Sequence, residues 1–142
     1  MNEDIKLQVG VKALLKNKDG RFLLLVKSGK KYTEIGYDIW DIPGGRIKPG
    51  VPLLENLKRE IKEETGLDLK FKPSLIAAQD ILRIEELHVV RLTYVADIDG
   101  DVRVDGEEHT DYKWLSLEEM KKVEVLDIYV KELVDGGKLE NL

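Results

Sequence analysis

The stretch that decides the fold runs from Gly44 to Leu67 and reads GGRIKPGVPLLENLKREIKEETGL. Pro52 suits the first turn of a helix, and Gly66 supplies a stop at a helix C-terminus. Between them, apolar side chains recur at helical spacing and predict an α-helix over residues 53–65. The recurring apolar residues are Leu53, Leu54, Leu57 and Ile61.

Three carboxylates gather on this predicted helix. Glu60 and Glu64 are one turn apart, and Glu63 is adjacent to both. Crowded carboxylates repel one another unless a positive charge lies among them, and Mg²⁺ commonly sits between carboxylates and the phosphates of a substrate. Leu57 and Ile61 are expected to anchor the opposite side of the helix in the core. An isolated string of this kind is more often a solvated helix face, so its interpretation depends on the surrounding sequence.

The surrounding sequence resembles the signature of the Nudix hydrolases. That signature is Gly, five residues, Glu, seven residues, then Arg-Glu-apolar-any-Glu-Glu-any-Gly-apolar. The chain matches every specified position from Gly45 to Leu67 except one, and residues 40–45 resemble the Trp-x-x-Pro-Gly-Gly lead-in common in the family. The resemblance implies an α/β fold, a Nudix-type α/β/α sandwich around a mixed β-sheet. It also implies Mg²⁺-dependent hydrolysis of a pyrophosphate bond, with Mn²⁺ as an alternative metal.

The resemblance also implies roles for individual residues. It makes Glu60, Glu63 and Glu64 metal ligands, together with the carbonyl oxygen of Gly44. Glu60 is in addition the candidate catalytic base, and Arg59 is expected to hold the carboxylates in place. The mechanism implied is in-line attack of a metal-activated water on phosphorus, without a covalent enzyme intermediate.

The one departure from the signature is Val51, where the family has Glu. Valine can neither bind metal nor pair with Arg59. Glu55 lies four residues before Arg59, a favourable direction for an ion pair along a helix, and is a candidate for the missing partner. The alternative is that Glu55 is simply exposed. A module that binds a nucleotide as a sensor without hydrolysing it is the alternative from another class, and the three retained carboxylates argue against it.

Further candidate residues lie outside the predicted helix. Family members often supply another acidic metal ligand from a loop shortly before a Trp. Glu108, six residues before such a Trp, is the expected ligand, with Glu107 in reserve. His109 is expected to be a loop residue rather than a catalyst. Trp40 and Tyr37 are candidates for stacking on a nucleotide base, and packing is the alternative role for an aromatic residue in this position.

The remaining sequence predicts one domain, residues 1–142, of strands mixed with helices. Alternating or short apolar runs predict strands over residues 5–15, 22–26, 39–42, 75–84, 88–98 and 112–115. The first two are expected to form a hairpin, and 75–84 and 88–98 to be antiparallel. Pro43 and the two glycines after it are expected to stop the strand at 39–42. Residues 99–111 are expected to be a loop and 117–134 one helix or a broken pair.

Composition excludes several functional classes. The chain has no cysteine, which excludes disulfides and thiolate chemistry. Its formal net charge is −5, and it has no basic stripe for holding a polynucleotide. It also lacks a signal peptide and an apolar run of the ~20 residues that would cross a bilayer. We therefore expect a soluble, cytoplasmic monomer or homodimer that binds a small-molecule nucleotide and no membrane.

The expected substrate depends on only a few features of the sequence. The length and the Pro-Gly-Gly lead-in resemble the MutT-type nucleoside triphosphate pyrophosphohydrolases. The proline that follows the signature in members acting on ADP-ribose is absent, since residues 82–84 are Leu-Arg-Ile. The tyrosine associated with diadenosine polyphosphates is missing from the same place. We expect a (deoxy)nucleoside triphosphate cleaved to a monophosphate and pyrophosphate, with a nucleoside diphosphate sugar or ADP-ribose as the alternative.

Overall fold

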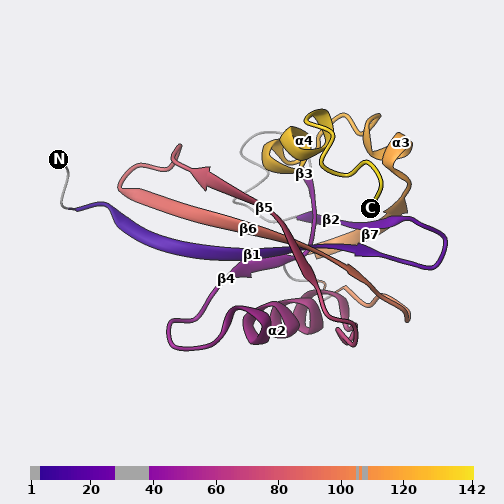
Figure 1. Ribbon diagram of the computed structural model, residues 1–142, viewed down its shortest axis with the longest axis horizontal. Helices are drawn as coiled ribbons and strands as arrows, with labels where there is room; N and C mark the ends of the chain where they lie inside the picture. The colour runs from indigo at the N-terminus through magenta and orange to yellow at the C-terminus, as the bar shows by residue number, and fades with distance from the viewer. Residues whose placement is uncertain (1–3, 28–38, 105, 107–108) are drawn as a thin grey trace.

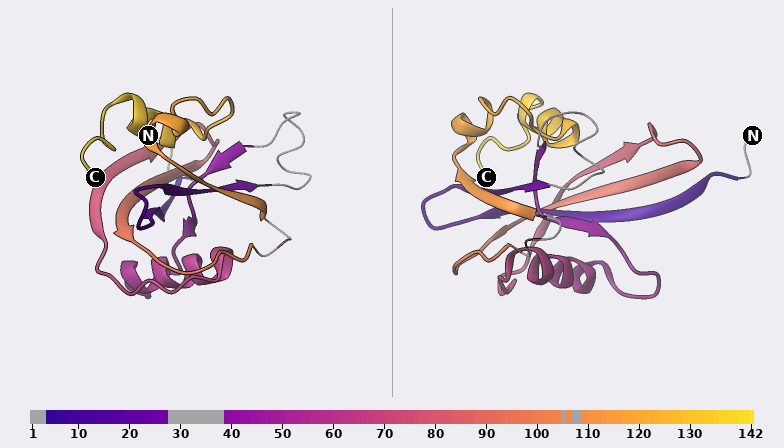
Figure 2. Two further views of the ribbon diagram at one scale, coloured as in Figure 1. Left: turned by 90° about the vertical axis from the view of Figure 1, so that its right-hand side faces the viewer. Right: turned by 180° about the vertical axis from the view of Figure 1, so that it is seen from behind.

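The computed structural model describes residues 4–27, 39–104, 106 and 109–142, and it shows a mixed β-sheet between two helical layers (Figure 1). Helix α2 (Leu53–Thr65) covers one face of the sheet. Helices α3 (Leu117–Met120) and α4 (Ile128–Asp135) lie on the other face. Figure 2 shows the same three layers from two further sides. The expected α/β/α sandwich around a mixed sheet is confirmed.

Three long strands form the continuous part of the sheet. Strand β1 (Lys6–Lys16) runs parallel to β6 (Leu87–Asp97) along its whole length. Strand β5 (Ser74–Ile81) pairs antiparallel with β6, as the alternating sequence pattern predicts. Because β6 lies between β1 and β5, the N-terminal strand is held by residues from the second half of the chain.

The expected hairpin between the first two strands forms, but it is short. The turn forms, with the Gly20 amide donating to the Asn17 carbonyl, but β1 and β2 (Phe22–Lys27) are registered only at Lys16 and Phe22. Earlier in β1, residues 9–13 are bonded to the segment at 43–47 instead. Strand β2 also pairs antiparallel with two other strands, β3 (Ile39–Asp41) and β7 (His109–Leu115).

Strand β3 ends at Asp41, before Pro43 as expected, but the two glycines that follow are themselves extended. Gly44 to Arg46 form a short strand, β4 (Gly44–Arg46), antiparallel to β1, with Gly45 opposite Val11. Gly44 has φ +136°, and a Cβ there would lie 2.1 Å from the Val11 carbonyl oxygen, so this close approach of two backbones requires glycine. The loop expected over 99–111 also ends early, because β7 already begins at His109. The C-terminal segment is the broken pair of helices, α3 and α4.

The two helical layers bury separate apolar clusters against the sheet. Leu57 and Ile61 of α2 are fully buried, as predicted, against the side chains of one face of β1, namely Val11, Ala13 and Leu15. On the other face, Leu14 of β1 joins a cluster that includes Met120 and Val130. Gly66 ends α2 in the left-handed conformation, at the predicted residue. None of the helices in the described residues is long and apolar enough to cross a membrane.

Candidate active site

Helix α2 places its acidic side chains beside the glycines of β4. The helix is fixed from the opposite side by Leu57 and Ile61, so the carboxylates rest on a rigid element. Glu60 lies directly against Gly45: a Cβ on Gly45 would be 2.8 Å from Oε2 of Glu60 and 3.0 Å from Oε1. The missing side chain at Gly45 therefore makes room for the Glu60 carboxylate.

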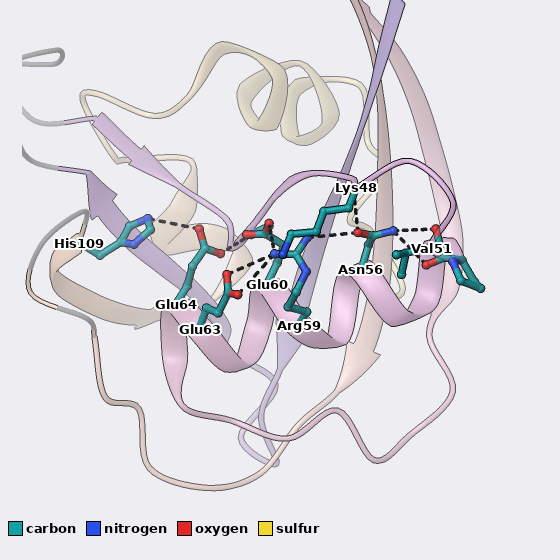
Figure 3. A network of polar contacts seen from close by, with 10 residues as sticks. Lys48, Val51, Asn56, Arg59, Glu60, Glu63, Glu64 and His109 are labelled. Carbon is teal, nitrogen blue, oxygen red and sulfur yellow. Dashed lines mark hydrogen bonds and ion pairs between the residues drawn. The ribbon is translucent and has the colours of Figure 1, made fainter.

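Glu64 is the most enclosed of the three carboxylates. Only 5% of its surface is exposed, and its Oε2 accepts a hydrogen bond of 2.6 Å from the Gly44 amide. Its Oε1 lies 3.6 Å from Nε2 of His109, the buried first residue of β7 (Figure 3). Glu64 therefore connects α2 with β4 and β7. His109, expected to be a loop residue, is part of this arrangement, and its position immediately after the predicted acidic ligand gave no signal of that.

Arg59 lies between the other two carboxylates. Its Nη1 is 3.0 Å from Oε1 of Glu60 and 3.3 Å from Oε2 of Glu63. The Glu60 side chain is 15% exposed and the Glu63 side chain 57%. Both carboxylates therefore reach one positively charged group, whereas Glu64 is directed toward His109 (Figure 3) and accepts from the Gly44 amide.

This donor set fits a hard divalent cation in part. Within residues 4–27, 39–104, 106 and 109–142, no three Asp, Glu or His side chains converge as a group that could hold a metal ion. Two carboxylates, Glu60 and Glu63, do share one cationic neighbour. Mg²⁺ usually takes only one or two protein carboxylates and completes its octahedron with water and substrate phosphate. The carboxylates of Glu60 and Glu63 therefore fit a hard divalent cation, and the metal-binding roles of Gly44, Glu60, Glu63 and Glu64 stay predictions.

Asn56 is a residue of the site that the sequence interpretation missed. It is fully buried, and its Oδ1 accepts a hydrogen bond of 3.1 Å from Nη2 of Arg59. Glu55, the candidate partner from the sequence, is exposed, and in the described part of the chain the ion pairs of Arg59 are with Glu60 and Glu63. The proposed Glu55–Arg59 pair is therefore wrong. The available signal was spacing, because Asn56 precedes Arg59 by three residues and so shares its helix face.

A pocket of about 270 Å³ adjoins the two glycines on the α4 side of the sheet. A buried charge network forms one wall. Asp41 accepts from Nζ of Lys12 and from Nη2 of Arg91, each at 3.1 Å, and Arg91 also lies 3.3 Å from Asp127, the N-cap of α4. The pocket is lined by these four residues and, among others, by Gly44, Gly45, Arg46, Arg83 and Tyr129.

Burial and mutual charge shift the titration of this network. Desolvation, and then the neighbouring charge of Asp41, raise the pKa of Asp127 above its ordinary value. Desolvation acts to lower the pKa of Arg91, but Asp41 and Asp127 outweigh it, and the pKa of Arg91 is raised. Arg91 is therefore a permanent positive charge in the pocket wall.

Trp40, one of the two aromatic candidates, does not line this pocket. Trp40 lines a separate hollow of about 620 Å³ beside α3, where Nζ of Lys113 lies 4.6 Å from the centre of its ring. We regard the smaller hollow as the candidate binding pocket because it shares Gly44 and Gly45 with the carboxylates. Tyr37, Glu107 and Glu108 lie outside the described residues, and their roles stay predictions.

Comparison with known proteins agrees with this arrangement. Residues 6–133 match the family model of the NUDIX domain. A putative 8-oxo-dGTP diphosphatase of Bacillus subtilis (strain 168) is 35% identical over 78 residues, covering 55% of this chain and 50% of that protein. The ADP-ribose pyrophosphatase of Methanocaldococcus jannaschii is 27% identical over 106 residues, covering 75% of this chain and 60% of that protein.

A solved structure extends the likeness to the whole chain. The crystal structure of a MutT protein from Methanosarcina mazei Go1 superimposes with a TM-score of 0.83 at 29% identity, covering 99% of each chain. The chain spans half or less of the length of the first three curated relatives that it matches. With a family model that covers nearly all of it and a carboxylate-bearing helix packed against two glycines, the chain belongs to the Nudix family.

Proposed function

We propose that the protein is a Mg²⁺-dependent hydrolase of a pyrophosphate bond in a nucleoside diphosphate-linked compound, with a (deoxy)nucleoside triphosphate as substrate. One observation carries the proposal. The carboxylates of α2 and the pocket on the other side of β4 share Gly44 and Gly45. Because glycine has no side chain, only the backbone of β4 lies between the pocket and Glu60 at these two positions. The phosphates of a nucleotide in the pocket would therefore lie close to Glu60.

The charge of the pocket supports a phosphate-bearing ligand. Lys12, Arg46, Arg83 and Arg91 line it, although the protein as a whole carries a formal charge of −5. Concentrating cations in one hollow of an acidic protein attracts an anionic ligand to that hollow. Asp41 and Asp127 offset part of this charge, and their buried acceptor oxygens also offer groups that discriminate among ligands.

The residues of α2 supply the proposed chemistry. Glu60 is the base, because its carboxylate lies beside Gly45 and is only partly exposed. Arg59 holds Glu60 and Glu63 at a fixed separation, and Glu64 fixes α2 to the Gly44 backbone. Bound Mg²⁺ would neutralise phosphate oxygens and lower the pKa of a coordinated water. Proton transfer to a positioned carboxylate typically contributes 10²–10⁴-fold to the rate.

The choice among substrates rests on the sequence and on relatives that differ. One relative is named a putative 8-oxo-dGTP diphosphatase and another an ADP-ribose pyrophosphatase. Both names denote hydrolysis of a diphosphate or pyrophosphate linkage. Residues 82–84 lack the proline associated with ADP-ribose, which favours a nucleoside triphosphate.

A nucleotide panel with Mg²⁺ and with excess EDTA tests the proposal. Nucleoside triphosphates, nucleoside diphosphate sugars and ADP-ribose are the three arms, and a Glu60→Gln variant is the control for contaminating activity. We expect monophosphate and pyrophosphate from the triphosphate arm in Mg²⁺ alone. Label from ¹⁸O-water appearing only in orthophosphate from the γ position would overturn the reaction, and binding without turnover in every arm would support the sensor alternative.

A further inference from the structure

We propose that Asn56 is the positioning residue for Arg59 and replaces the acidic partner that the Nudix signature places at position 51. The inference rests on the proposed function, because its consequence is the placement of Glu60 and Glu63 for hydrolysis. Asn56 stands at a position that the signature leaves unspecified. Val51 contributes only an aliphatic side chain, so Arg59 needs another partner on that side.

The hydrogen bonds of Asn56 define its orientation. Its Nδ2 donates to the carbonyl oxygens of Val51 and Pro52, at 2.8 and 3.1 Å. Its Oδ1 accepts from the Lys48 amide at 2.9 Å and from Nη2 of Arg59 at 3.1 Å (Figure 3). An Asn side chain has two donor hydrogens and two acceptor lone pairs, so all four are used.

The alternative amide orientation is excluded by the same contacts. Exchanging Oδ1 and Nδ2 would place the NH₂ group against two donors, the Lys48 amide and the Arg59 guanidinium. It would also place the amide oxygen against the carbonyls of Val51 and Pro52. Because Asn56 is fully buried, water cannot compensate for these mismatches. The acceptor is therefore fixed toward Arg59.

This fixed acceptor determines how Arg59 faces the carboxylates. The planar guanidinium is held at Nη2 by Asn56 and presents Nη1 to Glu60 and Glu63. In the described residues, the buried Nε of Arg59 has no hydrogen-bond partner. Without Asn56, the guanidinium would be held only by the carboxylates that it is meant to arrange.

The partner that Asn56 provides is neutral. An amide oxygen holds Arg59 without neutralising it, so the full positive charge stays opposite Glu60 and Glu63. Asn56 also joins the segment at 48–52 to the helix through its other three hydrogen bonds. A purely structural role would use those three bonds alone, so the experiment has to isolate the bond to Arg59.

A double-mutant cycle on Asn56→Ala and Arg59→Ala isolates the contribution of the hydrogen bond between Asn56 and Arg59. We expect Asn56→Ala to lower kcat about tenfold, with a smaller change in KM, because transition-state placement rather than substrate binding is lost. In the Arg59→Ala background, the same change should lower kcat by less than about twofold, because the partner is gone. Multiplicative losses of kcat would overturn the proposal and assign Asn56 to the segment at 48–52 alone.

Asn56→Asp serves as the conservative variant and covers the case in which Asn56→Ala fails to fold. Asp keeps both acceptor contacts but sets an oxygen against the carbonyls of Val51 and Pro52. Its thermal unfolding midpoint should therefore fall while kcat stays within about threefold of wild type. A folded Asn56→Asp variant that loses kcat as severely as Arg59→Ala would contradict the inference.

Failure of the proposed function can be distinguished from failure of the positioning role of Asn56. If the wild type hydrolyses no compound in the nucleotide panel, the proposed function is wrong. The double-mutant cycle is then measured by the affinity for Mn²⁺ alone, using electron paramagnetic resonance. Asn56→Ala should then shift the Mn²⁺ affinity in the same direction as Arg59→Ala, with no further shift in the double variant. Independent, additive shifts would overturn the positioning role.

Discussion

Replacing Gly45 with Ala should separate activity from stability. The added Cβ would lie 2.8 Å from Oε2, 2.9 Å from Cδ and 3.0 Å from Oε1 of Glu60. The optimal separation of non-bonded heavy atoms is roughly 3.5–4.0 Å, so the Glu60 carboxylate must move by roughly 0.5–1 Å. A displacement of about 1 Å at a reacting group can cost about 10²-fold in rate. We therefore expect kcat to fall by one to two orders of magnitude, measured at saturating substrate and Mg²⁺.

The folded state should tolerate this change, because the obstacle is the far end of a flexible side chain. Gly45, unlike Gly44, does not need a positive φ, and a compatible Gly→Ala change stabilises by about 0.4–1 kcal/mol through the unfolded state. We expect the free energy of unfolding to change by less than about 1 kcal/mol.

Gly44→Ala is the matched control. Its Cβ would lie 2.1 Å from a backbone carbonyl oxygen at φ +136°, so this variant should lose stability severely. A folded Gly45→Ala variant with kcat within about threefold of wild type would refute the argument that Glu60 acts from its place beside Gly45.

Three other outcomes are expected. Glu60→Gln should lower kcat by about 10²-fold or more with the fold retained, and a loss of less than about threefold would remove Glu60 as the base. A double-mutant cycle on Glu55 and Arg59, read from kcat and from chemical denaturation, should give a coupling energy near zero, whereas coupling above about 0.5 kcal/mol would restore Glu55 as a partner. Burial and Asp41 raise the pKa of Asp127 in the folded protein, so ionising this side chain lowers the free energy of unfolding. The loss is absent below the ordinary pKa of about 3.9, where Asp127 is protonated in both states, and it grows as the pH rises from there through the raised pKa. Asn still caps a helix, so the Asp127→Asn variant should gain stability relative to wild type as pH rises from about 3 to 7, and a difference that stays constant with pH would contradict this.

The sequence predicted the parts of the site that local signals determine. The bounds of α2 followed from apolar periodicity between Pro52 and Gly66. Strand β4 was missed because its residues include two glycines and are extended only through pairing with β1. The hairpin is short for a related reason, because β4, which is distant in the chain, pairs with β1 at residues 10–12.

The pocket and the Asn56 contact were not predictable from spacing alone. Lys12, Asp41, Arg91 and Asp127 come from β1, β3, β6 and the start of α4, and only the fold brings them together. The signature marked Val51 as a departure but named no replacement. Asn56 became one because its partners include the backbone carbonyls of Val51 and Pro52, whose positions depend on the path of the chain into α2.

The parallel pairing of β1 with β6 has a consequence for how the protein folds. Each paired residue is 81 positions from its partner, from Lys6 with Leu87 to Lys16 with Asp97, and α2 lies inside the loop that this pairing closes. Contacts between residues so distant in sequence slow folding, because the chain loses the entropy of loop closure before the contacts form and stabilise the structure. During synthesis, Leu57 and Ile61 can meet β1 early, but β1 acquires its parallel partner only after residue 97 has been added. The helix that carries the carboxylates is thus translated well before the sheet that holds it is complete, and we expect activity to appear late in folding, on the slow timescale of proteins with high contact order.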